Sequence, residues 1–275
     1  MSAFLPHQAL RGVCAYRALA VCVLTAAMLP LDGNAQPLQV QPPKGQALDV
    51  STLPWRAPTA SRMQFEVRGK LKGLPYRTTA QLDWRPSADR YEASQEIQVP
   101  LLGGRRQSSV GALTAQGLLP EIFMDRSRRE DSTTFDASAG IIRFSRGDES
   151  VAWVRGTQDR LSVFFQVAGL IAAAPERYPQ GTRITVQAAS TRHVTPWVFQ
   201  VQTQETLSLP AGEIPALKLE HLSTHKKADH HEAADLQSAL WLALAPGLRY
   251  LPVRIRLVED EGDELDLRLK SHVQP

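Results

Sequence analysis

The chain repeats one pattern many times: apolar and polar residues alternate with a period of two. In three runs, residues 63–67, 76–84 and 91–99, apolar side chains recur at about every second position, and charged or polar side chains stand between them. The same alternation returns in the C-terminal part, from residue 184 to residue 269. A strand with one apolar and one polar face is typical of an antiparallel sheet, because strands of parallel sheets are buried on both faces and read as apolar throughout.

Short turn sequences separate these alternating runs. Pro210-Ala211-Gly212-Glu213 and Asp260-Glu261-Gly262-Asp263 have the length and composition of hairpin connections. The sequence therefore predicts a mainly β fold, namely a large curled antiparallel sheet or open barrel of roughly ten or more strands. Because such a sheet gathers its apolar side chains on one face, something must cover that face.

One stretch departs from the period of two. From Leu161 to Ala174 no residue is charged, and the apolar residues recur at steps of three and four, as on a helix face. We expect a helix with Thr157 as its N-cap, Asp159 in its first turn and Pro175 at its end. Fourteen helical residues span about 21 Å, which is less than the roughly 30 Å of a bilayer core. We therefore expect the helix to lie on the concave face of the sheet rather than in a membrane.

The first 35 residues resemble an export signal. Two arginines precede an apolar core at 18–29, and a small-residue site ends at Ala35. The core has about a dozen residues, fewer than the roughly 20 of a membrane anchor, so we expect cleavage near Ala35 and a periplasmic protein. Cys14 and Cys22 both fall in the part removed, so the mature chain forms no disulfide.

Prolines then dominate residues 36–58, which we interpret as a flexible tether. We expect residues 59–275 to form a single β-rich domain. The formal net charge of +3 is too small to indicate a nucleic-acid partner.

A histidine-rich stretch between residues 220 and 232 is the strongest candidate for a metal site. His225, His230 and His231 could hold zinc, nickel or copper through their ring nitrogens. However, His231-Glu232 lacks the second histidine of the metalloprotease motif, where Asp235 stands instead, and two lysines in the stretch would repel a cation. We interpret it as a solvated loop and expect no metal and no cofactor.

Other polar clusters also have simple interpretations. Asp159 is suited to stabilising the start of the helix. We read Arg105 and Arg106 as part of a turn, although an exported protein could use them on phosphate head groups, and residues 126–131 as a polar strand or loop. The fingerprints of the nucleophile elbow, the P-loop and the dinucleotide-binding turn do not occur in the sequence, and we assign no catalytic residue.

Several short landmarks follow one another in a familiar order. They are Gly117-Leu118-Leu119-Pro120 with Phe123, then Phe135-Asp136, then Gly156-x-Gln158-Asp159-x-Leu161-Ser162, and finally Trp241 with Leu251-Pro252-Val253-Arg254-Ile255. Over roughly residues 60 to 272 the chain resembles the bacterial envelope family catalogued as domain of unknown function 3108 (DUF3108). The resemblance implies an exported β-rich protein with no established activity and no catalytic residues to transfer. We read Gln158, Asp159, Leu161, Ser162, Pro252 and Arg254 as its structural motif.

These features support two hypotheses about function. In the first, the protein binds or carries a hydrophobic or lipid-like ligand inside the curled sheet, without catalysis. The ligand pocket that we expect is lined by Phe164, Phe165, Ala168, Ile171, Trp84, Phe135 and Trp241. In the alternative, it is a structural or assembly partner in the cell envelope that binds another protein through exposed strand edges.

Overall fold

The computed structural model describes residues 39–41, 48–49, 53–99, 103–146, 150–222, 237–259 and 262–275. The predicted export signal at residues 1–35, with Cys14 and Cys22, lies outside the described residues. So do His225, His230 and His231 of the histidine-rich stretch.

Seventeen strands within the described residues join in one sheet. In chain order the strands are β1 (Gln39–Gln41), β2 (Leu48–Asp49), β3 (Ser61–Leu71), β4 (Leu74–Pro86), β5 (Arg90–Val99), β6 (Gly103–Thr114), β7 (Gly117–Arg126), β8 (Glu130–Asp136), β9 (Ile141–Phe144), β10 (Ser150–Ala152), β11 (Gln158–Asp159), β12 (Arg183–Ala189), β13 (Val194–Leu209), β14 (Gly212–Leu222), β15 (Gln237–Ala245), β16 (Leu251–Glu259) and β17 (Glu264–Val273). The helix α1 (Ser162–Ala173) is followed by two 3-10 turns, η2 (Pro175–Arg177) and η4 (Pro246–Leu248).

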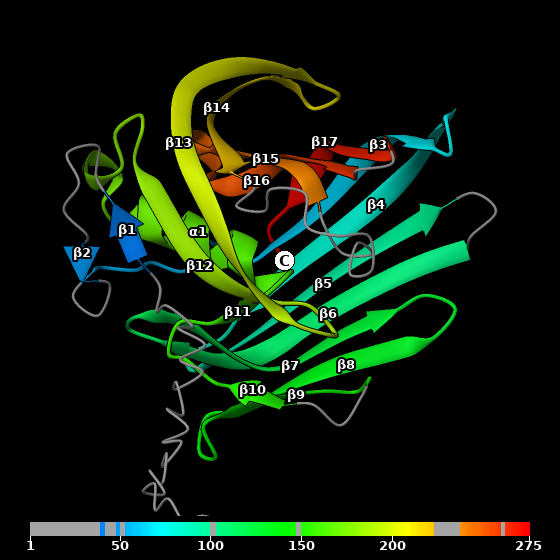
Figure 1. The fold of residues 1–275 in the computed structure, drawn as a ribbon. Coiled ribbons are helices and arrows are strands. Elements are labelled where there is room, and N and C mark those ends of the chain that lie inside the picture. The colour runs from blue at the N-terminus through cyan, green and yellow to red at the C-terminus, as the bar shows by residue number, and fades with distance from the viewer. Residues whose placement is uncertain are drawn as a thin grey trace, which may run out of the picture. The chain divides into compact units, whose positions relative to one another are not determined.

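The sheet consists of two meanders, which are joined where the last strand of the chain, β17, pairs with β3. Strands β3 to β10 pair consecutively, and so do β12 to β17. The antiparallel pairing of β17 with β3 connects the two meanders, so the C-terminal strand lies at the centre of the sheet. The sheet is curled but unclosed, as predicted (Figure 1).

The sheet is held in its curled shape by contacts between the β7–β8 region and the β12 end. No continuous backbone ladder joins these two regions among the described residues. The short strand β11 pairs in parallel with β12 and contacts β7. Thr133 of β8 donates a hydrogen bond of 2.8 Å to the carbonyl oxygen of Ser190, just beyond β12. The prediction of antiparallel strands is confirmed for the pairs of both meanders, and the β11–β12 bridge is a local exception.

The predicted helix exists, but it begins later than we expected. Its first residue is Ser162, because Gln158 and Asp159 are held in the extended bridge to β12. Thr157 is therefore not the N-cap. The end agrees with the prediction, since Pro175 opens η2 directly after the helix. Ten residues of α1 are buried, as expected for a helix that is apolar on every side and lies in a core.

Residues 53–58, which we expected in a flexible tether, pack against α1. The indole nitrogen of Trp55 donates to the carbonyl oxygen of Gln166, and the amide of Arg56 donates to the carbonyl oxygen of Gly169, each at 3.1 Å. Leu53 is only 4% exposed. The prolines mark an extended segment, but its apolar residues have a surface to cover. The tether interpretation is therefore wrong for these residues.

Candidate functional site

The inner face of β4 to β9 is built from rows of residues that lie directly opposite one another. One row is buried throughout, and we call it the buried row: Trp84, Ala93, Ser109, Phe123, Thr133 and Phe144. Because opposite residues of paired strands share a face, the next row on this face lies two residues further along each strand.

That next row is polar, and we call it the polar row: Gln95, Gln107, Asp125 and Asp131. Its members are half-buried, whereas the buried row is sealed. On β6, β7 and β8 the inner face therefore changes from closed to accessible in one step along each strand, whereas on β5 the next inner residue after Gln95, Ile97, is buried again.

Ion pairs hold the polar row. Asp125 accepts hydrogen bonds from Arg105 Nε at 2.9 Å and from Gln107 Nε2 at 2.8 Å, and Asp131 accepts one from Arg146 Nε at 2.8 Å. Burial acts to raise the pKa of Asp125, but the hydrogen bonds and charge of Arg105 outweigh it, and the pKa is lowered. Asp125 is thus a carboxylate at neutral pH. Arg105 belongs to β6 and is not in a turn, so that prediction is wrong.

A second accessible row runs across the junction of the two meanders, from β16 and β17 to β3 and β4, and is apolar. Leu257 of β16 lies opposite Leu265 of β17, which lies opposite Gly69 of β3, and Gly69 in turn lies opposite Tyr76 of β4. We call this the leucine row. The Tyr76 ring lies over Gly69, where an added Cβ would come within 2.2 Å of it. The accessible part of the inner face is therefore polar on β5 to β8 and apolar on β16, β17 and β4.

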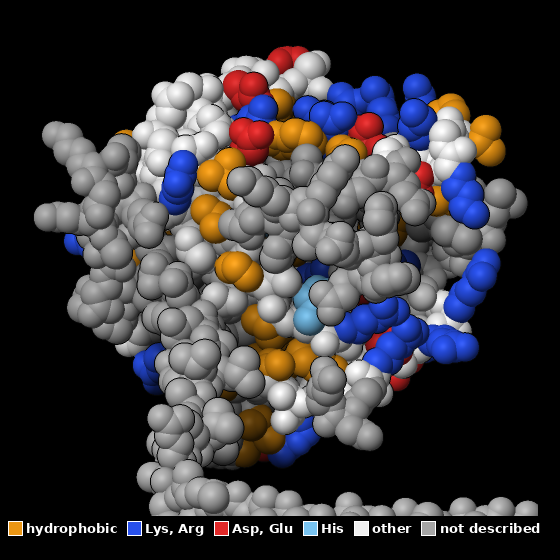
Figure 2. Space-filling view, in the orientation of Figure 1, with side chains coloured by type: hydrophobic (Ala, Val, Ile, Leu, Met, Phe, Trp, Pro, Cys, Tyr) orange, Lys and Arg blue, Asp and Glu red, His pale blue; other side chains and the backbone are white. Residues whose placement is uncertain are grey.

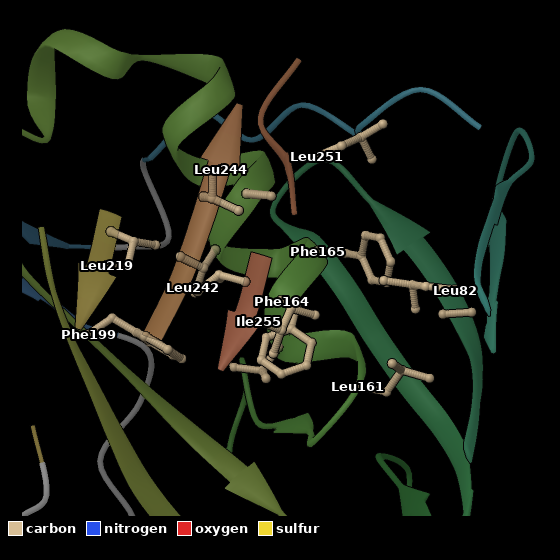
Figure 3. Packing of buried hydrophobic residues seen from close by; sticks show 14 of the residues in the cluster. Leu82, Leu161, Phe164, Phe165, Phe199, Leu219, Leu242, Leu244, Leu251 and Ile255 are labelled. Carbon is tan, nitrogen blue, oxygen red and sulfur yellow. The ribbon is translucent and has the colours of Figure 1, made fainter. Parts of the chain in front are cut away.

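A chain of aromatic rings crosses the interior on both sides of α1. Phe165 stacks on Trp84 at a centroid distance of 4.3 Å, and Trp84 stacks on Tyr91 at 5.6 Å. Phe164 points to the opposite wall, 6.4 Å from Trp197 of β13. Figure 3 shows Phe165 beside Leu82, and Phe199 approaching from the other side.

The predicted pocket residues do not all come together. The α1 residues Phe164, Phe165, Ala168 and Ile171 are buried, as is Trp84, at 5% exposure or less. They fill the space beneath the helix.

Two other predicted pocket residues lie elsewhere. Phe135 is buried on β8, opposite Ile142 of β9. Trp241 is on the other parity from the buried Leu240 and Leu242, and Arg256 lies over its ring at 4.9 Å. Its place in an internal pocket is therefore wrong, because the alternation of β15 directs it to the outer face.

His221 is the unexpected polar side chain of the interior. It lies near the end of β14, with its ring centroid 5.4 Å from that of Trp197 and 5.9 Å from that of Phe199. Both ring nitrogens are buried and have no hydrogen-bond partner among the described residues. Burial lowers the pKa of His221 to about 4, so the ring is neutral at pH 7.

Asp159 forms the centre of a sealed hydrogen-bond network. Ser109 Oγ donates to Asp159 Oδ2 at 2.5 Å, and the amides of Leu161 and Ser162 donate to Oδ1 at 2.8 Å. Tyr91 shares a hydrogen bond of 2.9 Å with Ser109. Burial raises the pKa of Asp159, against the hydrogen bonds that lower it. The network ties the start of α1 to β6, and Asp159 is 0% exposed, so it has no access to a substrate.

Two glutamines complete the same junction by acting in place of a strand. Gln158 Nε2 donates to the carbonyl oxygen of Leu118 at 2.9 Å, and the amide of Leu118 donates to Gln166 Oε1 at 2.8 Å. Strand β8 pairs with β7 only from Ile122 onward, which leaves the backbone groups of Leu118 for these side chains. Gln158 and Gln166 therefore supply the hydrogen bonds that a neighbouring strand would make.

The remaining motif residues lie on β16, next to the central strand β17. Pro252 is the second residue of β16, where a missing amide proton is tolerated. Arg254 binds both carboxylate oxygens of Asp266 at 2.9 Å. In the described part of the chain no group of three or more His, Cys, Asp or Glu side chains has the arrangement of a metal site.

The sequence profile of the family described as Protein of unknown function (DUF3108) matches residues 64–270. The chain belongs to this family. The match contains the whole Gln158 to Ser162 junction, so the DUF3108 motif coincides with the point where the curled sheet is held together. None of the curated proteins compared with the chain matches it.

Two solved structures are similar to this DUF3108 domain at low sequence identity. A β-barrel-like protein of the DUF1849 family from Brucella abortus is 10% identical, with a TM-score of 0.52, over 80% of this chain and 99% of that one. A putative outer membrane lipoprotein-sorting protein domain from Vibrio parahaemolyticus is 8% identical, with a TM-score of 0.26, over 78% of this chain and 85% of that one. The first comparison shows a β-barrel-like architecture.

Sequence reasoning missed the polar row of this DUF3108 domain and also His221. Gln95 stands at an inner position of an alternating run, where an apolar residue is the rule, and this break in parity is a readable signal. Gln107 and Asp125 lie in stretches that do not alternate, so only the register of β5, β6 and β7 shows that the three residues form one row. None of the helices in the described residues has the length and apolarity that a membrane-spanning helix needs.

Proposed function

We propose that the protein is an exported, non-catalytic envelope protein that binds an amphipathic ligand on the inner face of its curled sheet. The observation that carries this proposal is the division of the accessible inner face into the polar row on one side and the leucine row on the other. A face that served stability alone would be apolar, because burying polar groups costs free energy that burying methyl groups does not.

The location of the ligand differs from our expectation from the sequence. The space beneath α1 is filled by Phe164, Phe165 and Ile171, which are at most 5% exposed. The ligand instead lies beyond the helix, with its apolar part along Leu257 and Leu265 and its polar part beside Gln95 and Gln107. The most buried carboxylate, Asp159, is sealed in its network, which supports a role in structure and not in catalysis.

Neighbouring positions on β5 allow a matched test. Gln95 belongs to the polar row, whereas Ser94 faces the other side of the same strand. We expect Gln95→Trp to obstruct the inner face and reduce uptake of a fluorescent fatty acid, and Ser94→Trp to leave uptake unchanged. Protein purified natively from the periplasm is extracted with organic solvent and the extract is analysed by mass spectrometry. An empty extract together with no uptake by the wild-type protein would refute the proposal.

A second candidate function, docking of another envelope protein, has one specific observation in its favour. Strand β10 pairs only with β9 among the described strands, and its Val151 is 37% exposed. An edge of this kind can accept an added strand from a partner. Replacing Val151 with proline would block the added strand; loss of a crosslinked partner in cells, with fatty-acid uptake retained, would favour this second function.

A further inference from the structure

Two adjacent hairpin ends of the sheet carry a cluster of arginines. Arg106 of β6 lies opposite Arg126 of β7, and Arg128 and Arg129 form the turn that follows β7. We call these four residues the arginine tip. All four are exposed, and none forms a salt bridge with another described residue.

Elsewhere on the described surface many arginines have an acidic partner. Arg62 pairs with Asp83 at 3.0 Å. The other such pairs include Arg90 with Glu121, Arg143 with Asp136, Arg254 with Asp266 and Arg256 with Glu264. The arginine tip therefore differs from this general pattern. Two acidic residues lie opposite the tip in register, Glu96 opposite Arg106 and Glu130 opposite Arg126. Because the tip has four arginines, an excess of positive charge remains.

The arginine tip lies at the end of β6 and β7 that is away from the helix. Gln166 of α1 binds near the opposite end, at the β6–β7 turn, where its side chain donates to the carbonyl oxygen of Gln116. The tip is thus beside the accessible part of the inner face. Figure 2 shows Lys and Arg side chains along the right margin of the molecule, where Figure 1 places the hairpin ends of β3 to β8.

We propose that the arginine tip binds the phosphate head groups of an anionic lipid surface. Guanidinium groups bind phosphate through paired hydrogen bonds, and each arginine near an anionic membrane strengthens binding by about fivefold. A protein partner needs apolar or aromatic anchors at the centre of its site. Gly104, Ser127 and Glu130 beside the tip are not apolar anchors, and the exposed Ile122 lies four residues before Arg126 on the same face of β7. The four charges of the tip therefore fit a lipid surface better than an acidic protein.

The inference does not depend on the proposed ligand. It also predicts how the inner face of the sheet is oriented relative to the membrane. With the tip on a bilayer, the polar row and the leucine row lie at the membrane side and α1 at the far side. Attraction of this kind is reversible and falls as salt rises, because the screening length is about 10 Å at 0.1 M salt.

The test is co-sedimentation with vesicles of phosphatidylglycerol and phosphatidylcholine in equal parts, with pure phosphatidylcholine vesicles for comparison. We expect the protein to bind the anionic vesicles at low salt and to leave them at high salt. Reversing two charges in Arg128→Glu/Arg129→Glu should weaken binding by on the order of a hundredfold. The control, Arg177→Glu/Arg183→Glu, makes the same charge change at exposed positions in η2 and β12 and should retain most of the binding.

Two results would overturn the proposal. One is that the wild-type protein does not bind the anionic vesicles. This result would overturn the proposal even if the arginine tip bound an acidic protein. The other is an equal loss in the control variant, which would indicate diffuse attraction by the whole molecule. Circular dichroism verifies that each variant is folded. Mass spectrometry of extracted ligand is a separate readout, so failure of the ligand proposal leaves this test intact.

Discussion

Phe165 of α1 stacks on Trp84 of β4 with ring centroids 4.3 Å apart and ring planes 14° apart. Trp84 in turn donates a hydrogen bond from its indole nitrogen to the carbonyl oxygen of Pro58 at 2.9 Å. One pair of rings therefore connects the helix, the sheet and the segment that precedes β3. Both side chains are 0% exposed, so the stack lies in the closed half of the interior.

Removing the Phe165 ring should destabilise the protein strongly. We expect Phe165→Ala to lower the free energy of unfolding by about 3–5 kcal/mol, because it removes buried apolar area and leaves a cavity beside Trp84. Phe165→Leu keeps most of the volume and should cost less. Urea unfolding followed by tryptophan fluorescence measures both changes. A loss below about 1 kcal/mol for the alanine variant would contradict the packing described here.

The glutamine pair that binds Leu118 can be tested one partner at a time. Gln166→Leu leaves the buried amide of Leu118 without an acceptor, which should cost about 1–3 kcal/mol. It should also accelerate hydrogen exchange at that amide. Gln158→Leu is the matched control, since it frees the carbonyl oxygen of Leu118 and leaves the amide bound. If both variants exchange the Leu118 amide at the wild-type rate, the strand-like role of Gln166 is wrong.

Gly169 is the position where α1 touches the segment before β3. A Cβ there would lie 2.2 Å from Trp55 Nε1 and 2.8 Å from the carbonyl oxygen of Arg56. Gly169→Ala gains about 1 kcal/mol of helix propensity, but the clash with backbone should outweigh this gain and displace residues 53–58. Limited proteolysis should then cut that segment faster than in wild type. Unchanged proteolysis would show that the segment adapts.

His221 should make stability depend on pH. Its pKa is about 4 in the folded protein, against 6.5 when it is exposed. The unfolded chain therefore binds more protons between these values, and stability falls as the pH decreases from 6.5 to about 4, by at most about 3 kcal/mol.

Replacing the imidazole removes this dependence. His221→Leu should be at least as stable as wild type at pH 7, because it deletes two buried nitrogens that have no hydrogen-bond partner among the described residues. It should lose less stability than wild type when the pH is lowered to 5. Urea unfolding at both pH values gives the difference, and parallel pH profiles for the two proteins would count against a buried neutral ring.

The parts of the fold that the sequence predicted depend on residues close together in the chain. Met63, Phe65 and Val67 show the inner parity of β3 by themselves, and all three are buried. The recurrence from Leu161 to Ile171 likewise predicted α1. The predicted N-cap, Thr157, is wrong because Gln158 and Asp159 pair with β12, a strand that follows the helix in the sequence.

The candidate site shows the opposite case. Gln95 breaks an alternating run and Asp125 lies in a stretch that does not alternate, and only the pairing of β5, β6 and β7 places them in one row. The size of Trp241 predicts a place in the interior, because large aromatic residues are often buried, whereas the parity of β15 directs it outward.

The sequence by itself determined the β class of the protein, the inner parity of its strands and the helix that covers their apolar face. These follow from steps of two, three and four residues, which local backbone geometry imposes. Only the tertiary structure decided which polar groups share the interior and how the edges of the sheet are joined. Contacts such as Ser109 with Asp159 form between residues 50 positions apart, and their geometry depends on register and on the curl of the whole sheet.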